Sequence, residues 1–124
     1  MSTDTQKAQC HWISNTHWDR EWYQPFEEFR IRLVLLVDKL LYLLDTDPGY
    51  RYFMLDGQTI ALDDYLAIRP ENRAKIEGYV RDGRIQIGPW YILPDEFLVS
   101  GESTIRRARS INEASSRGIL EALP

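Results

Sequence analysis

YFMLDG, residues 52–57, is the stretch of sequence that decides the fold class. Its first four residues are apolar or aromatic, and Asp56 and Gly57 close the run with a turn. A short apolar run that ends in turn-forming residues is typical of an interior strand of a parallel sheet, where both faces are covered. We therefore predict a buried strand over residues 52–55, and the remaining elements are placed around it.

Two further stretches predict strands. Residues 9–14 include Cys10, Trp12 and Ile13, which fit a mostly buried pleated surface, so we expect Trp12 to lie in the core. Residues 84–88 alternate between polar and apolar, which places Ile85 and Ile87 on one buried face.

Helical periodicity separates these strands. After Pro25, apolar residues recur at positions 29, 33, 36, 37, 40, 41 and 44, the spacing of one helix face, and Leu35 and Leu43 widen that face. So broad an apolar stripe predicts a helix that is covered on more than one side. Shorter helices are expected over residues 62–68 and from Pro70 to about Gly83, which would cap its helix in the left-handed conformation. A last helix is expected over residues 102–121.

This order of strands and helices predicts an α/β fold, a mostly parallel sheet flanked by helices, over residues 10–124, preceded by a polar tail at residues 1–9. The unusual motifs then fall in equivalent places, because each follows a strand: THWDREWY at 16–23, LDGQ at 55–58 and GPWYILPDE at 88–96. Ligands of such folds bind beyond the carboxyl ends of the strands. We expect the three motifs to share one edge of the sheet.

Composition limits the class of protein. Of the 124 residues, 44% are hydrophobic and 27% are charged, as in a folded globular domain. The net charge of −4 leaves no basic surplus for phosphates, so nucleic acid is not an expected partner. No apolar stretch is long enough to span a bilayer, residues 1–9 lack the apolar core of a secretory signal, and the single Cys10 cannot form an internal disulfide. The expected location is the cytoplasm, away from membranes.

His17 and Asp19 are the candidate metal ligands. In an extended segment, residues two apart point to the same side, so this imidazole and this carboxylate can converge on one ion, a donor pair that suits zinc. Another interpretation stays open at this point. Asp19 would then pair with Arg20 or cap the turn, and His17 would be hydrogen-bonded at the surface.

Aromatic residues surround this pair at Trp18, Trp22 and Tyr23. Flat aromatic faces beside polar groups are typical of sugar-binding sites, where the ring of the sugar stacks on the aromatic ring. The alternative is that these side chains belong to the core. For Trp22, which lies in a loop among charged residues, the functional interpretation is favoured.

Three blocks of the sequence carry a family resemblance. THWDREWYQPFEEFR at 16–30, FMLDGQTIALDDYLAIRPENR at 53–73 and GRIQIGPWYILPDEFLVSGES at 83–103 resemble, in the right order, motifs of the family 38 glycoside hydrolases, the zinc-dependent α-mannosidases, and especially of the bacterial members. The resemblance runs from about Cys10 to near the end of the chain. It implies that residues 10–124 form the N-terminal part of the catalytic α/β domain of an α-mannosidase.

The resemblance also implies a reaction, retaining hydrolysis of terminal α-linked mannose, and site roles. His17 and Asp19 would bind zinc, and Trp22 would stack on the mannose ring. The family's nucleophile and acid/base residues come from later blocks, so we expect them beyond residue 124 and expect the isolated chain to be inactive. Its partners would be a mannose-containing glycan or oligosaccharide and the remainder of its own polypeptide. No role is assigned to the remaining polar residues of the blocks, Asp56, Gln58, Asp95 and Glu96.

Two other functions remain open. Another metal-dependent carbohydrate hydrolase, such as a deacetylase, also uses His and Asp at strand ends, but it would need a further histidine pair, and His11 is the only other histidine. The second alternative is a non-catalytic α/β module that forms a homo-oligomer through an open sheet edge.

Overall fold

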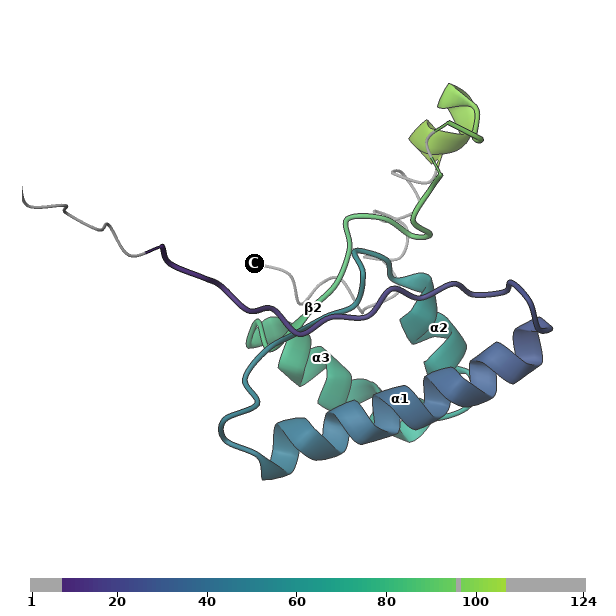
Figure 1. The fold of residues 1–124 in the computed structure, drawn as a ribbon. Coiled ribbons are helices and arrows are strands. Elements are labelled where there is room, and N and C mark those ends of the chain that lie inside the picture. The colour runs from purple at the N-terminus through teal and green to yellow at the C-terminus, as the bar shows by residue number, and fades with distance from the viewer. Residues whose placement is uncertain (1–7, 96, 107–124) are drawn as a thin grey trace, which may run out of the picture.

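The computed structural model describes residues 8–95 and 97–106. Along the chain the elements are α1 (Phe26–Thr46), β1 (Phe53–Met54), α2 (Ile60–Leu66), a short 3-10 helix (Pro70–Asn72), α3 (Arg73–Arg81) and β2 (Ile85–Gln86), as Figure 1 shows. Residues 101–106 form a further helical segment on an arm that leads away from the other helices (Figure 1).

The sheet is built on β1. On one side β1 pairs in parallel with β2, with Phe53 opposite Ile85. On its other side Asn15 forms a parallel bridge with Met54, whose N–H donates to the carbonyl of Ser14 at 3.0 Å. Three parallel segments therefore lie side by side with β1 in the middle, which confirms the predicted α/β class. The predicted strand over residues 9–14 is wrong in its extent, because pairing with β1 begins only at Ser14.

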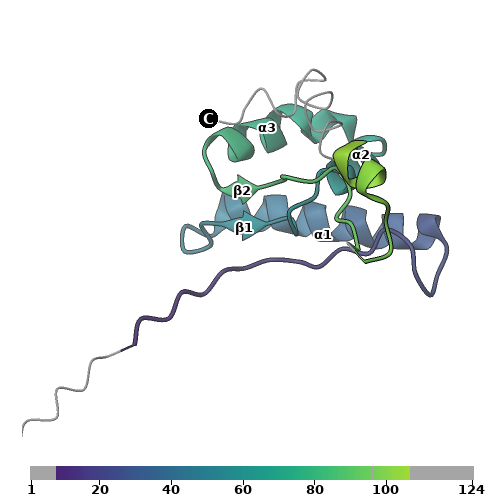
Figure 2. The same cartoon turned by 90° about the horizontal axis from the view of Figure 1, so that it is seen from above.

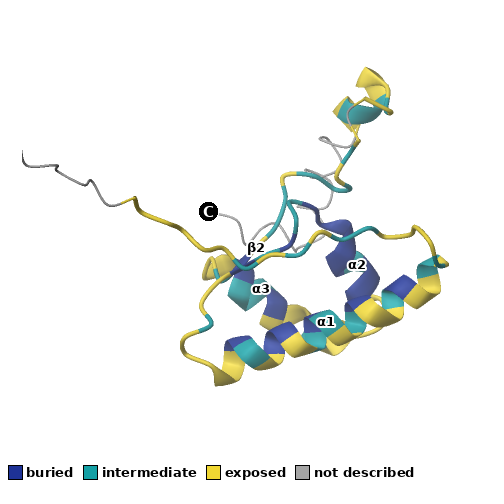
Figure 3. Cartoon of the chain, in the orientation of Figure 1, coloured by how far each residue is buried: buried dark blue, intermediate teal, exposed yellow. Residues whose placement is uncertain are grey.

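α1, α2 and α3 lie on one side of the strands in Figure 1, and Figure 2 shows the strands running over the space between α1 and α3. Phe53, Leu55 and Ile85 point toward the helices and are buried, whereas Met54 is half-buried and Gln86 is exposed. Alternate strand residues point to opposite faces, so this pattern is that of a sheet covered on one face by the described residues. Figure 3 shows the buried positions gathered between the strands and the inner faces of the helices.

α1 supplies most of the core. Its predicted apolar period is confirmed, since the buried residues are Phe29, Leu33, Val37, Leu40, Leu41 and Leu44. The helix begins at Phe26, directly after Pro25 and three residues before the apolar period. Proline is tolerated at the start of a helix, but its ring and its missing N–H would disrupt any helical turn before it. Leu35 and Ile31 are 66% and 63% exposed, so the described residues do not cover the outer part of the stripe.

Tyr65 fastens α2 to its neighbours. Its side chain is fully buried, its hydroxyl donates to Asp38 of α1 at 2.6 Å, and it accepts from the amide of Asn72 at 2.5 Å. Burial of the phenol and its bond to Asp38 raise the pKa of Tyr65 to about 12. The tyrosine thus stays protonated, and able to donate, at neutral pH.

Helix boundaries follow local hydrogen bonds. α2 begins at residue 60, two residues earlier than predicted, because the Ile60 N–H donates to the carbonyl of Tyr91 at 2.9 Å. α3 ends at Arg81, and Gly83, two residues later, has the predicted left-handed conformation with a φ of +68°. There the Arg84 N–H donates to the carbonyl of Tyr79 at 2.8 Å, which satisfies a terminal carbonyl of the helix.

Trp12 is the clearest departure from expectation. The prediction placed it in the core, but it is 93% exposed, because it precedes the first residue that pairs with β1. Parts of two other predictions, the tail at residues 1–7 and helix residues 107–121, lie outside the described residues, as does Glu96. None of the helices in the described ranges is long and apolar enough to cross a membrane.

Replacing Leu33 by alanine should lower the free energy of unfolding by about 2–5 kcal/mol, because Leu33 is 1% exposed and its removal leaves a cavity in the core. Leu35→Ala is the matched control, since it makes the same change on the same helix at a 66% exposed position and should cost less than about 0.5 kcal/mol. Urea denaturation followed by circular dichroism measures both. Equal losses would contradict the one-sided core.

Candidate functional site

The three segments that follow the parallel strands meet at one edge. The Trp18 N–H donates to the carboxylate of Asp56 at 3.2 Å, which joins the first segment to the second. Gln58 forms a parallel bridge with Trp90, and the Thr59 N–H donates to the carbonyl of Trp90 at 3.0 Å, which joins the second segment to the third. The sequence-based expectation that the motifs share an edge is confirmed by these contacts.

His17 and Asp19 converge at this edge. Their Nε2 and Oδ1 atoms are 3.5 Å apart, which is longer than a good hydrogen bond. Zinc binds such atoms at about 2.0–2.2 Å, so two of its tetrahedral ligands lie about 3.3–3.6 Å from each other, and the observed separation fits a shared ion. The two side chains are 68% and 41% exposed, so the pair is open to solvent.

Among the described residues, this edge supplies two candidate ligands for one ion. Within residues 8–95 and 97–106, no group of three His, Cys, Asp or Glu side chains is placed to hold one metal ion. Asp56 is close to His17, but its Oδ2 atom lies 2.8 Å from Nδ1, the ring nitrogen on the other side from Asp19. A zinc ion at this edge would therefore need further ligands from water, substrate or other protein residues.

Arg20 does not pair with Asp19, which was one interpretation of the sequence. Its Nε and Nη2 atoms instead donate to both carboxylate oxygens of Asp64 on α2, at 2.6 and 2.9 Å. Donation of these hydrogen bonds to Asp64 raises the pKa of Arg20, and the guanidinium lies 4.4 Å from the centre of the Phe26 ring. The bidentate pair ties the loop that carries the candidate ligands to the helical layer.

The tryptophans of this loop have different surroundings. Trp18 is half-buried, packs against the core and meets the ring of Phe29 edge-on at 6.2 Å. Trp22 is 75% exposed and meets Tyr23 edge-on at 6.1 Å, and Tyr23 in turn packs on Phe29 at 5.3 Å. Trp18 therefore anchors the loop. Trp22 instead exposes its indole ring to solvent while it packs on Tyr23.

Sequence reasoning left Asp56 and Gln58 without a role, and the structure places both at the centre of the site. Gln58 is 3% exposed, and its amide nitrogen donates to the carbonyl of Trp18 at 2.7 Å. The available signal was a carboxylate and an amide placed directly after a buried strand. That signal could not separate site residues from turn residues, because Asp-Gly is also a common turn pair.

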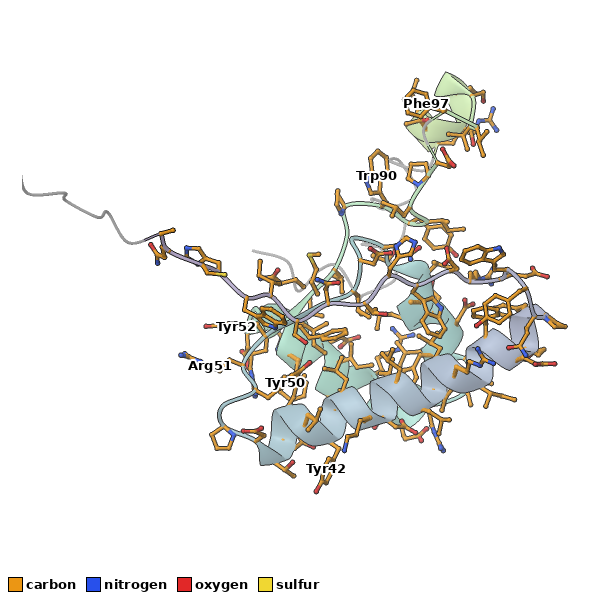
Figure 4. All side chains as sticks on the ribbon, in the orientation of Figure 1. Tyr42, Tyr50, Arg51, Tyr52, Trp90 and Phe97 are labelled. Carbon is orange, nitrogen blue, oxygen red and sulfur yellow. The ribbon has the colours of Figure 1, made fainter. Side chains whose placement is uncertain are left out.

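Asp95 lies on the arm after β2, where its main chain, not its side chain, makes the contacts that the structure shows. Its carbonyl accepts the N–H groups of Leu98 and Val99, which forms a turn on the arm after β2. Phe97, 98% exposed, lies farther out on this arm than Trp90, as Figure 4 shows.

A hollow of about 520 Å³ lies at the opposite end of the strands, where they begin. Figure 4 labels two of its residues, Arg51 and Tyr52, on the segment that leads into β1. Ligands of parallel α/β sheets bind where the strands end, so this hollow is not the candidate site. Its lining residues are Leu44, Asp45, Pro48, Arg51, Tyr52, Asp82 and Arg84.

Comparison with known proteins identifies the family of this chain. Residues 7–109 match the family model described as the glycosyl hydrolases family 38 N-terminal domain. The fold and the match define a glycoside hydrolase domain. The chain belongs to family 38 of the glycoside hydrolases, as part of its N-terminal domain.

Relatives show the same family. A protein of Halalkalibacterium halodurans named "Putative mannosylglycerate hydrolase" is 57% identical over 100 residues, which are 81% of this chain and 11% of that protein. The crystal structure of an α-mannosidase from Enterococcus faecalis is 48% identical with a TM-score of 0.79, and that of a family 38 protein from the same organism is 45% identical with a TM-score of 0.75. Each similarity covers 85% of this chain and 12% of the solved chain. The chain thus spans about a ninth of the length of these relatives.

Asp64→Asn should lower the free energy of unfolding by about 1–3 kcal/mol, because it weakens two charge-assisted hydrogen bonds at a carboxylate that is 8% exposed. Glu27→Gln is the control, because Glu27 pairs with Arg30 at 2.7 Å but is 66% exposed, and such surface pairs contribute about 0–1 kcal/mol. Urea unfolding of both variants tests this. A loss no larger for Asp64→Asn would show that the loop is not tied to α2 by this pair.

Proposed function

We propose that this chain supplies one wall of the zinc and mannose site of a retaining α-mannosidase. His17 and Asp19 are the proposed zinc ligands, and Trp22 is the proposed shelf for the mannose ring. The observation that carries the proposal is the 3.5 Å separation of His17 Nε2 and Asp19 Oδ1 at the carboxyl edge of a sheet, in a member of family 38.

The chemistry of these residues supports the assignment. Zinc, when bound, supplies a Lewis acid that polarises and orients substrate oxygens. His17 offers an imidazole nitrogen and Asp19 offers a negative oxygen, a donor set that zinc accepts. The exposed face of Trp22 offers the apolar surface against which the C–H side of a pyranose packs, while polar groups bind its hydroxyls.

The rest of the reaction is proposed to lie in other parts of the polypeptide. A retaining glycosidase uses two carboxyl groups about 5–5.5 Å apart, one as nucleophile and one as acid/base. We assign neither role to a described residue. Because relatives of this chain are about seven times as long, we propose that the remaining polypeptide supplies both carboxyl groups and that the 124-residue chain by itself is inactive.

The proposed substrate is a glycan or smaller molecule with terminal α-linked mannose. Two relatives support it through their names, an α-mannosidase and a mannosylglycerate hydrolase, both of which specify a mannosyl group. Membership in a glycoside hydrolase family favours this substrate over the acetylated sugars of a carbohydrate deacetylase, the alternative that the sequence left open.

One surface favours a contact beyond the described residues. Ile31, Val34, Leu35 and Ile68 line a shallow groove of about 190 Å³ on the outer side of α1, and three of them are exposed. We propose that the remainder of the polypeptide covers this groove. The same apolar surface is the feature that favours a homo-oligomer as the alternative.

The chain should bind one zinc ion weakly, because two protein ligands leave the other coordination positions to water. His17→Ala should abolish that binding, because it removes one of the two ligands. Isothermal titration calorimetry with zinc alone measures this. His11→Ala is the matched control, since it removes the other histidine, beside the exposed Cys10, and should leave the binding unchanged. Loss of binding in His11→Ala, with retention in His17→Ala, would refute the assignment.

A chimera tests the role of Trp22. Residues 7–109 would replace the matching N-terminal part of the Enterococcus faecalis α-mannosidase, and hydrolysis of an aryl α-mannoside would be followed. Trp22→Ala should lower kcat/KM about tenfold or more, because it removes a stacking surface worth about 1 kcal/mol together with the apolar area it buries. Trp12→Ala removes an equally large exposed side chain elsewhere and should have no effect. Similar rates for Trp22→Ala and the unsubstituted chimera would exclude the shelf.

A further inference from the structure

We propose that Asp56 is a positioning residue that holds the proton of His17 on Nδ1, so that Nε2 presents its lone pair toward Asp19. This inference builds on the proposed zinc site but concerns the chain without metal. It assigns a role to a residue that the sequence alone leaves as part of a turn. The Asp56 carboxylate makes three contacts, and its neighbour Gln58 is buried.

The first contact fixes the imidazole. His17 Nδ1 and Asp56 Oδ2 are 2.8 Å apart. At that distance a bare nitrogen lone pair would face a negatively charged oxygen, which is repulsive, so Nδ1 carries the hydrogen and donates it. In the neutral ring, Nε2 is then an acceptor. It faces Asp19 Oδ1, a second acceptor, at 3.5 Å.

In the neutral ring, two acceptors that face each other form an arrangement that suits a cation between them. The arrangement of carboxylate, imidazole and second carboxylate is therefore that of a histidine whose far nitrogen is oriented for metal binding. Asp56 itself is the orienting group and not a third ligand, because its Oδ2 is engaged by the nitrogen on the opposite side of the ring.

The remaining contacts hold Asp56 and the loop together. Oδ2 of Asp56 also accepts the Trp18 N–H at 3.2 Å and lies 3.4 Å from the amide nitrogen of Gln58. The same Gln58 nitrogen donates to the Trp18 carbonyl at 2.7 Å. The N–H and the carbonyl of Trp18 are thus both bound by side chains of the segment after β1. We call this pair of contacts, from Asp56 and Gln58 to the main chain of Trp18, the clamp. Because Trp18 lies between the two proposed ligands in the sequence, the clamp sets the positions of both.

The side chains of the clamp are largely withdrawn from solvent. Asp56 has 18% of its side chain exposed and Gln58 is 3% exposed overall, whereas the His17 side chain is 68% exposed. The Gln58 amide oxygen also accepts the Leu93 N–H at 3.4 Å, which links the clamp to the segment after β2. An exposed imidazole is therefore oriented by groups that are themselves withdrawn from solvent.

Asp56 has an unusual backbone conformation. Its φ is +47°, in the left-handed region that aspartate and asparagine tolerate better than most residues with a side chain. Residues held there concentrate at functional sites. Gly57 follows with a φ of +67°, and a Cβ at that position would lie 3.2 Å from the carbonyl oxygen of Gly88. The chain therefore turns sharply while still placing a carboxylate beside His17.

Long-range ¹H–¹⁵N NMR correlations of the imidazole rings test the proposal, because they distinguish a proton on Nδ1 from one on Nε2. The 124-residue chain has two histidines, so its spectrum is simple, and the exposed His11 serves as an internal reference. Above about pH 8, where an ordinary imidazole is neutral, His17 should show the Nδ1–H form. A His17 with its proton on Nε2 in the unsubstituted chain would overturn the proposal.

Two substitutions sharpen this measurement. Asp56→Gly removes the carboxylate without backbone strain, because glycine accepts a positive φ, and should shift His17 to the Nε2–H form. Asp56→Asn keeps an oxygen acceptor and tolerates the same φ, so it should retain the Nδ1–H form. Asp47→Gly is the control, since it removes the same charge from the turn after α1, where the Asp47 carboxylate accepts the Gly49 N–H. An unchanged His17 spectrum in Asp56→Gly would overturn the proposal.

Zinc titration separates this inference from the proposed function. Asp56→Gly should bind zinc about 10–100-fold more weakly than the unsubstituted chain, while Asp47→Gly should bind it equally well. If the tautomer responds to Asp56 as expected but the chain binds no zinc through His17, the proposed function fails and the positioning role stands. If zinc binds through His17 but the tautomer and the affinity ignore Asp56, the positioning role fails and the proposed function stands.

Discussion

The candidate site depends on the way β1 divides its backbone hydrogen bonds between two neighbours. The N–H groups of Phe53 and Leu55 donate to Arg84 and Gln86 on the β2 side, whereas the N–H of Met54 donates to Ser14 on the other side. One short buried strand thereby aligns three parallel segments. The loops that follow them begin at the same level, and this alignment brings the histidine of one loop to the aspartate of the next.

Patterns that repeat along the chain were visible in the sequence. The apolar period of α1, the glycine cap of α3 and a parallel strand before Asp56 each depend on neighbours within a few residues, and each was predicted correctly. The predicted burial of residues 52–55 holds for Phe53 and Leu55 but not for Tyr52, which is 52% exposed. Trp12 was placed wrongly, because an apolar residue shows where a strand could lie but not how far its pairing extends. Only the hydrogen-bond partners of β1 define that extent, which begins at Ser14.

Contacts between distant residues explain the other limits of sequence reasoning. Arg20 and Asp64 are 44 positions apart, and Gln58 and Trp18 are 40 positions apart, so no local spacing signals either pair. His17 and Asp19, by contrast, are close in the sequence, and their convergence on one side of an extended segment follows from local geometry. The convergence of these two side chains was therefore predictable, while the long-range contacts of their loop were not.

The clamp around Trp18 has a consequence for how this loop tolerates change. Asp56 accepts the main-chain N–H of Trp18, and Gln58 donates to the main-chain carbonyl of Trp18. Every amino acid provides this carbonyl, and every one except proline provides the N–H. The spacing between the two neighbours of residue 18 is thus encoded in the main chain, independently of the indole. Replacement of the indole would change how the loop packs on Phe29, whereas any residue other than proline retains the main-chain contacts to Asp56 and Gln58.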